Sequence, residues 1–220
     1  LYNTEITDFG CIKHDKYHFI GASPDGINTK INNPRYGRML EIKNIVNRVI
    51  NGNPKFEYWI QMQLQMETCD LNECDFLETK FTEYVSEDAF NLDGSFTKSH
   101  DNKLKGRIIL FTENGNTHYE YAPLEITLEE YQEWEKEILN KNQEKEWIKN
   151  IFWKLEKYSN VLVLRNKLWF QKCLPLIEDL WNIILDERVT GYEHRAPKKR
   201  KQNNQEITSN KCFININKLE

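Results

Sequence analysis

The sequence predicts an α/β (α+β) fold in which helices flank a mixed central β-sheet. Two patterns support this prediction. Apolar and polar residues alternate along 38–45 and again along 73–84, with the period of a half-buried strand. Between these segments, residues 55–69 have the spacing of a helix packed on one side, and Gln63 and Gln65 are interpreted as its ordinary surface. Strands and helices interspersed in this way favour helices packed against a sheet.

The length of the chain favours one domain followed by a tail. With 220 residues the chain can bury a sizeable core, and we expect the domain to span residues 1–187. Residues 188–220 are polar and basic, so we expect a disordered tail there. The basic run at 197–201 is a weak pattern for nuclear localisation.

Membrane insertion and secretion are not expected. No run of about 18 apolar residues is present, and no secretory signal is visible, which favours an intracellular protein. The five cysteines are scattered, and their spacing does not match a zinc site. We therefore expect them to be reduced thiols.

The remaining segments are expected to complete the sheet and its helices. Residues 85–106 have mixed charge and are interpreted as an exposed loop. Thr127 and Glu130 have the spacing of a capping box, so a helix is expected to begin there and to run toward Trp147. Pro175 is expected near the first turn of the last helix. Six aromatic residues are expected in the core, namely Trp147, Phe152, Trp153, Trp169, Phe170 and Trp181. The other expected elements are strands at 1–14 and 17–22, a hairpin at 107–111 and 118–121, a strand at 151–164 and a helix at 169–185.

The residues with the clearest chemistry lie between 21 and 66. Ser23-Pro24-Asp25-Gly26 is a turn sequence after an apolar run, which places Asp25 at the end of a strand. Glu41 and Lys43 are two residues apart on the next predicted strand and therefore project to the same side. Two carboxylates with a lysine beside one of them suit Mg²⁺, which uses one or two carboxylates and leaves its other positions to water and phosphate. The pattern predicts a metal-dependent phosphodiester hydrolase.

Three motifs in this order resemble the nuclease core of the YqaJ-like viral recombinase family. They are Ser-Pro-Asp-Gly at 23–26, Glu-Ile-Lys at 41–43 and Tyr-x-x-Gln-x-Gln at 58–63. The family includes lambda-type exonuclease and belongs to the PD-(D/E)XK nuclease superfamily, so the resemblance implies a restriction-endonuclease-like core. It covers residues 19 to about 81. Family members usually carry helices upstream, and because the chain opens with Leu1 we expect part of that core to precede it.

The resemblance implies a role for each motif residue. Asp25, Glu41 and the Ile42 carbonyl would ligate Mg²⁺, with Mn²⁺ as a substitute. Lys43 would orient or activate the attacking water, and Gln61 would support the site from the following helix. The implied activity is exonuclease action on double-stranded DNA ends in viral or phage-type recombination or repair, in the cytoplasm or nucleus of an infected host. Implied partners are double-stranded DNA, a single-strand annealing protein and further copies of the chain.

The charge distribution bears on DNA binding. The formal net charge of −4 argues against a uniformly basic nucleic-acid-binding protein. Residues 26–56, however, contain six basic residues against one acid, which is the electrostatic footprint of a surface that contacts a phosphate backbone. The candidate DNA-binding residues are Ser23, Arg35, Arg38, Arg48 and Tyr58.

Three alternatives stay open from the sequence. A structure-specific endonuclease or junction resolvase would use the same core but would not require a DNA end. A catalytically silent DNA-binding module is disfavoured by the intact set of Asp25, Glu41 and Lys43. A structural protein in which the motif arose by chance would show no dependence on divalent ions.

Overall fold

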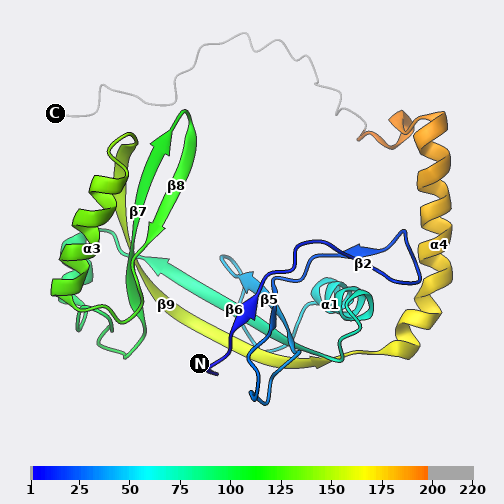
Figure 1. The fold of residues 1–220 in the computed structure, drawn as a ribbon, viewed down its shortest axis with the longest axis horizontal. Coiled ribbons are helices and arrows are strands. Elements are labelled where there is room, and N and C mark those ends of the chain that lie inside the picture. Colours follow the sequence, from blue (N-terminus) through cyan, green and yellow to red (C-terminus); the bar gives the residue numbers. More distant parts are fainter. Residues whose placement is uncertain (1, 198–220) are drawn as a thin grey trace, which may run out of the picture. The chain divides into compact units, whose positions relative to one another are not determined.

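The order of strands in the main sheet determines where the candidate residues lie. The computed structural model of the chain describes residues 2–197, and within them a seven-stranded mixed sheet has the order β1-β4-β5-β6-β9-β7-β8 (Figure 1). β5 and β6 are parallel, and the other neighbours are antiparallel. The strands are β1 (Ile6–Thr7), β4 (Gly26–Asn28), β5 (Met39–Asn44), β6 (Glu73–Glu83), β9 (Glu146–Leu164), β7 (Lys105–Glu113) and β8 (Asn116–Tyr121). The predicted mixed sheet flanked by helices is confirmed.

Four α-helices accompany this sheet in the described residues. They are α1 (Phe56–Thr68), α2 (Glu87–Leu92), α3 (Leu128–Lys141) and α4 (Lys167–Thr190), and a short 3-10 helix follows at Glu193–Arg195. No helix among residues 2–197 combines the length and the hydropathy that a membrane span requires. β2 (Ile12–Lys13) and β3 (Gly21–Ala22) form a separate antiparallel pair.

The chain divides into two compact units inside α4. The first unit ends at Leu174 and contains both sheets, and the second begins at Pro175. In the second unit, the Glu187 carboxylate accepts a hydrogen bond from Arg195 Nε at 2.5 Å. Since α4 continues to Thr190, it also extends past the predicted domain end at residue 187.

The parallel pairing of β5 and β6 explains the position of helix α1. Parallel neighbours need a long crossover, and here the chain crosses over as a helix packed on one face of the sheet. Met62 of α1 is fully buried in a cluster with Met39 of β5 and Phe76 of β6. Because side chains alternate along a strand, Glu41 and Lys43 share the face of Met39, which α1 covers.

Most of the elements expected from the sequence are confirmed. The strands expected at 38–45, 73–84 and 151–164 are β5, β6 and β9, the helix at 55–69 is α1, and the hairpin at 107–121 is β7–β8. The expected N-terminal hairpin is also present, although β2 and β3 pair over only two residues each. Thr127 and Glu130 form the capping box: Thr127 Oγ1 accepts from Glu130 N at 3.2 Å, and Glu130 accepts from Thr127 N at 2.8 Å.

The extension of this helix toward Trp147 is wrong. α3 ends at Lys141 because the side-chain amide of Asn142 donates to the Ile138 carbonyl at 2.9 Å and satisfies the last turn. Trp147 lies in β9 and is 52% exposed, so its predicted core position is wrong as well. Phe152 and Phe170 are buried as predicted.

The segment 85–106 is not simply an exposed loop. It contains α2 and leads into β7, whose Lys105 is buried. The Lys105 ammonium donates to the backbone carbonyls of Phe90, Asp93 and Ser95, at 2.6, 2.6 and 2.9 Å. Burial lowers the pKa of Lys105. Because Lys105 donates to three backbone carbonyls, it fixes the path of this segment. Local sequence patterns do not reveal these contacts.

The last helix begins earlier than predicted. The side chain of Asn166 accepts a hydrogen bond from Trp169 N at 3.0 Å and thereby caps the first turn. α4 consequently starts at Lys167, and Pro175 lies in the helix interior rather than near the first turn.

Candidate active site

Asp25 and Glu41 meet where two neighbouring strands pair. The Ser23–Gly26 turn leads into β4, whose antiparallel register places Gly26 opposite Leu40. Asp25 directly precedes Gly26, and Glu41 directly follows Leu40. The backbone N–H of Ile42 donates to Asp25 Oδ2 at 2.6 Å, which fixes this carboxylate against β5. The structure therefore brings the two predicted carboxylates together.

Glu41 is a fully buried carboxylate with three donors. Its side chain forms an ion pair with Lys43 and accepts hydrogen bonds from Gln61 Nε2 at 2.8 Å and Gln65 Nε2 at 2.9 Å. A buried charge is tolerated when it is paired and hydrogen-bonded in this way. Glu41 and Lys43 thus lie on the same side, as the strand period predicts.

Gln65 is a site residue that sequence reasoning missed. Its side-chain amide also donates to the Ser23 carbonyl at 3.2 Å, so it ties the turn that carries Asp25 to Glu41. The interpretation of Gln63 and Gln65 as ordinary surface is wrong, because they are only 1% and 3% exposed. The available signal was spacing: Gln65 follows Gln61 by four residues and therefore lies on the same side of α1.

If Glu41 ligates a metal ion, Gln65→Leu is expected to lower the kcat of the reaction at this site about tenfold to a hundredfold, the loss typical when a residue that orients a metal ligand is changed. Leucine fills a similar volume with an apolar side chain but cannot donate the hydrogen bonds to Glu41 and to Ser23. Gln63→Leu is the matched control, since Gln63 is equally buried on α1 but bonds the backbone of Leu164 and Asn166. It should lower the unfolding midpoint and leave kcat unchanged at temperatures where the fold is intact. Parental kcat in Gln65→Leu would show that the site does not depend on this amide.

Two of the candidate DNA-binding residues lie beside Lys43. The Tyr58 ring of α1 has the Lys43 ammonium 5.2 Å and the Arg48 guanidinium carbon 5.7 Å from its centre. These distances are typical of cation–π contacts, which hold both cations at one ring. Ser23, a third candidate, is exposed in the turn next to Asp25.

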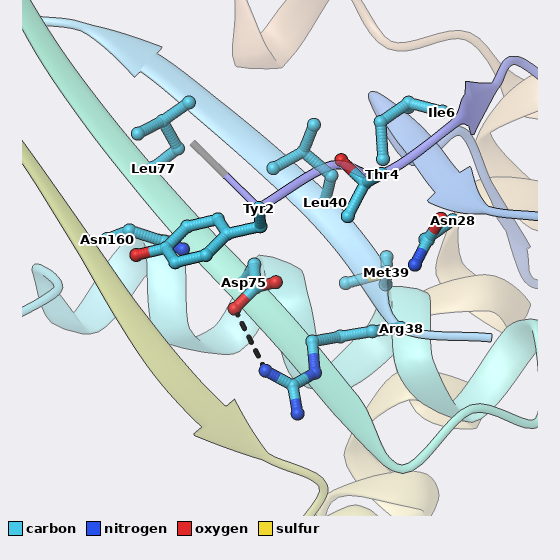
Figure 2. A pocket seen from close by; sticks show the side chains of 10 residues that line it. All are labelled: Tyr2, Thr4, Ile6, Asn28, Arg38, Met39, Leu40, Asp75, Leu77 and Asn160. Atoms are coloured by element: carbon cyan, nitrogen blue, oxygen red, sulfur yellow. Dashed lines mark hydrogen bonds and ion pairs between the residues drawn. The ribbon is translucent and has the colours of Figure 1, made fainter. Parts of the chain in front are cut away.

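The structure does not bring Arg35 and Arg38 close to Lys43 and the Tyr58 ring. Both pair with Asp75 of β6, at 2.6 and 3.3 Å, and the register of β5 and β6 places Asp75 next to Leu40 on the sheet face opposite Glu41. Figure 2 shows Arg38 and Asp75 in a pocket of about 190 Å³ on that face, where Tyr2 and Leu77 also lie. Their contact with DNA remains a prediction.

The basic excess counted along residues 26–56 is largely offset in the folded chain. Arg38 also pairs with Glu73 at 2.7 Å, and Arg48 pairs with Glu78, so acids of β6 neutralise basic residues that lie 35 and 30 positions earlier in the chain. Burial lowers the pKa of Arg38, but the charges and hydrogen bonds of Asp75 and Glu73 outweigh it, and the pKa is raised. A charge count over one segment cannot include these partners.

Cys74 lies close to the site but is not a nucleophile candidate. Burial, reinforced by the negative charges of Glu41 and Asp75, raises the pKa of its thiol. A neutral thiol is a poor nucleophile and a poor metal ligand. The four described cysteines, at 11, 69, 74 and 173, are free thiols, as predicted for that part of the chain.

The donor set fits a hard cation that keeps most of its water. An ionised carboxylate offers about four acceptor positions, and three donors reach Glu41, so roughly one position remains for a cation. Asp25 is exposed, and Gln65 Oε1 is buried without a hydrogen-bond partner.

Among residues 2–197 no group of three or more His, Cys, Asp and Glu side chains could hold a metal ion. Two carboxylates suit Mg²⁺, which accepts such incomplete protein ligation, better than zinc.

The fold and the site point to one fold class. A mixed sheet flanked by helices, with two acidic residues and a lysine where neighbouring strands β4 and β5 meet, is consistent with the restriction-endonuclease-like fold. Residues 1–72 match the family model of the YqaJ-like viral recombinase domain, whose members are typically nucleases. The resemblance that the motifs show is therefore confirmed over this part of the chain, which contains Asp25, Glu41, Lys43, Gln61 and Gln65.

Similarity to a viral protein extends over nearly the whole chain. Uncharacterized protein R354 of Acanthamoeba polyphaga mimivirus is 30% identical over 259 residues, which cover 98% of this chain and 47% of the viral protein. The chain thus spans about half the length of this relative.

Proposed function

We propose that the chain is the core of a Mg²⁺-dependent exonuclease that acts on double-stranded DNA ends in viral or phage-type recombination or repair. The observation that carries the proposal is the unit of Asp25, Glu41 and Lys43, held by two glutamines of α1 inside the region that matches a viral recombinase domain. The viral relative supports an infected host cell as the setting. The family resemblance supports a single-strand annealing protein and further copies of the chain as partners.

The chain's own residues would divide the work as follows. Asp25, Glu41 and the Ile42 carbonyl would hold Mg²⁺, or Mn²⁺ in its place. The bound ion would supply an activated water and a charge that stabilises the departing 3′ oxygen. Lys43, paired with Glu41, would place its ammonium where negative charge develops on the scissile phosphate. Gln61 and Gln65 would keep the Glu41 carboxylate in one orientation, because each fixes one of its oxygens.

The test is digestion of end-labelled linear DNA and covalently closed circular duplex DNA, with Mg²⁺ and with EDTA. We expect Mg²⁺-dependent loss of the linear DNA alone, and the release of label from one end gives the direction of digestion. Cleavage of the circle at a similar rate would replace the exonuclease with an endonuclease or junction resolvase on the same core. Absence of Mg²⁺-dependent cleavage of both substrates would contradict the proposed activity for this chain.

A further inference from the structure

A second buried carboxylate lies beside the candidate lysine. Glu78 is on β6, and the parallel register pairs it with Lys43 of β5. Its side chain is fully buried and forms an ion pair with Arg48. Within residues 2–197, neither Glu78 oxygen has a hydrogen-bond partner, so the ion pair with Arg48 is the contact that balances this buried charge.

Arg48 is the member of this ion pair that can reach a ligand. The Arg48 side chain retains 22% exposure, whereas that of Glu78 retains 1%. Arg48 Nη2 faces the buried anion and Nε is buried as well, while the guanidinium carbon lies 5.7 Å from the centre of the Tyr58 ring, which Lys43 also contacts. A guanidinium has five donors in a rigid fork, so an arginine held in this way keeps the two N–H groups of Nη1 for a phosphate.

Two simpler roles for Glu78 are less well supported. A metal ligand would be expected to join Asp25 and Glu41, but no such group of three is assembled among the described residues. A buried ion pair adds little net free energy of folding, because the cost of desolvating the two charges cancels much of their attraction. A purely stabilising role therefore does not explain this pair. An apolar pair of similar volume would stabilise the sheet at least as well.

We propose that Glu78 is a positioning residue that holds Arg48 beside Tyr58 and Lys43, so that the guanidinium binds a phosphate of the DNA strand being cut. The proposal rests on the proposed function and adds a residue to it. Glu78 lies outside residues 1–72, the region that matches the recombinase family. It therefore gives the strand after α1 a part in DNA recognition.

The test compares the parent chain with Glu78→Gln, Arg48→Gln and the double variant on end-labelled linear duplex DNA with Mg²⁺. We expect Arg48→Gln to raise KM about tenfold or more, the loss expected for one charge-assisted hydrogen bond. Glu78→Gln should raise KM by about threefold to tenfold, and the double variant should be no worse than Arg48→Gln alone, since Glu78 acts through Arg48. The Mg²⁺ concentration for half-maximal rate should stay within about twofold of the parent, as a residue that does not ligate the ion predicts.

Three results would overturn the proposal. An unchanged KM in Glu78→Gln would show that Arg48 needs no anchor. Equal losses from Glu78→Gln in the parent and in the Arg48→Gln background would show that Glu78 acts independently. A large rise in the Mg²⁺ requirement of Glu78→Gln would make Glu78 a metal ligand instead.

Stability is controlled with a matched ion pair. Arg165 pairs with Glu67 of α1 at 2.8 Å, both side chains are largely buried, and this carboxylate pairs with an arginine that follows β9 rather than with Arg48. Glu67→Gln should lower the unfolding midpoint without raising KM. Arg48→Gln leaves Glu78 buried without its counter-charge, so Arg48→Lys, which keeps the charge but loses the fork, replaces it if the first variant does not fold.

The proposed function and this inference can fail separately. If the parent shows no Mg²⁺-dependent cleavage, the nuclease proposal fails, and the same variants are compared by equilibrium binding of a fluorescent duplex in EDTA. The coupling between Glu78 and Arg48 should then be seen in Kd, with the double variant no weaker than Arg48→Gln. Additive effects on Kd would overturn the positioning role.

Discussion

Glu41→Gln is expected to abolish Mg²⁺-dependent cleavage, with kcat lowered by about three orders of magnitude or more because stabilisation by the bound ion is worth several kcal/mol. The substitution preserves size but removes the charge that would hold the ion. DNA binding in EDTA should remain close to that of the parent, since Glu41 is buried and α1 covers its face. The measurements are single-turnover digestion of linear duplex and fluorescence anisotropy.

Folding of this variant needs its own control. The Gln61 and Gln65 amides both donate to Glu41, and an amide at position 41 offers them one acceptor oxygen instead of two. The unfolding midpoint should therefore fall, and activity is compared only where circular dichroism shows the intact fold. A folded Glu41→Gln protein that cuts at the parental rate would exclude Glu41 as a metal ligand.

Lys43→Ala is expected to lower kcat about 100-fold to 1,000-fold, the range found when one preorganised charge-stabilising group is removed. Lys43 pairs with Glu41 and lies at the Tyr58 ring, so its ammonium is held in one place before the reaction. The Mg²⁺ requirement should change little, because the two carboxylates remain. Lys149→Ala is the matched control, since that lysine pairs with the exposed Glu83 and should leave kcat unchanged. Undiminished turnover in Lys43→Ala would remove the lysine from the mechanism.

The parts of the site that could be predicted from sequence are those that local geometry determines. The turn that carries Asp25 follows from its Pro-Asp-Gly sequence, and the shared side of Glu41 and Lys43 follows from the strand period. The position of Gln61 follows from the helix spacing. In each case the residues that interact belong to one short segment or to a motif with a known order.

The parts that could not be predicted depend on contacts between distant segments. Burial of Gln65 depends on the Ser23 turn folding onto α1, and the offset of Arg48 by Glu78 depends on the register of β6. The fold of residues 85–106 depends on Lys105, the first residue of β7, which is charged and gives no apolar signal in the sequence. A short stretch of sequence contains only one of the two interacting residues, so these contacts cannot be predicted from local patterns.

The two hydrogen bonds of Gln63 have a consequence for the order in which the protein folds. Gln63 donates to the Leu164 carbonyl and accepts from Asn166 N, contacts that span 101 and 103 residues of chain. Its neighbours Gln61 and Gln65 on the same helix hold Glu41. Contacts of such high sequence separation form late, because long loops must close first. Helix α1 is therefore held on both sides only when the end of β9 and the start of α4 have docked, which makes completion of the core around α1 a late event in the folding of this chain.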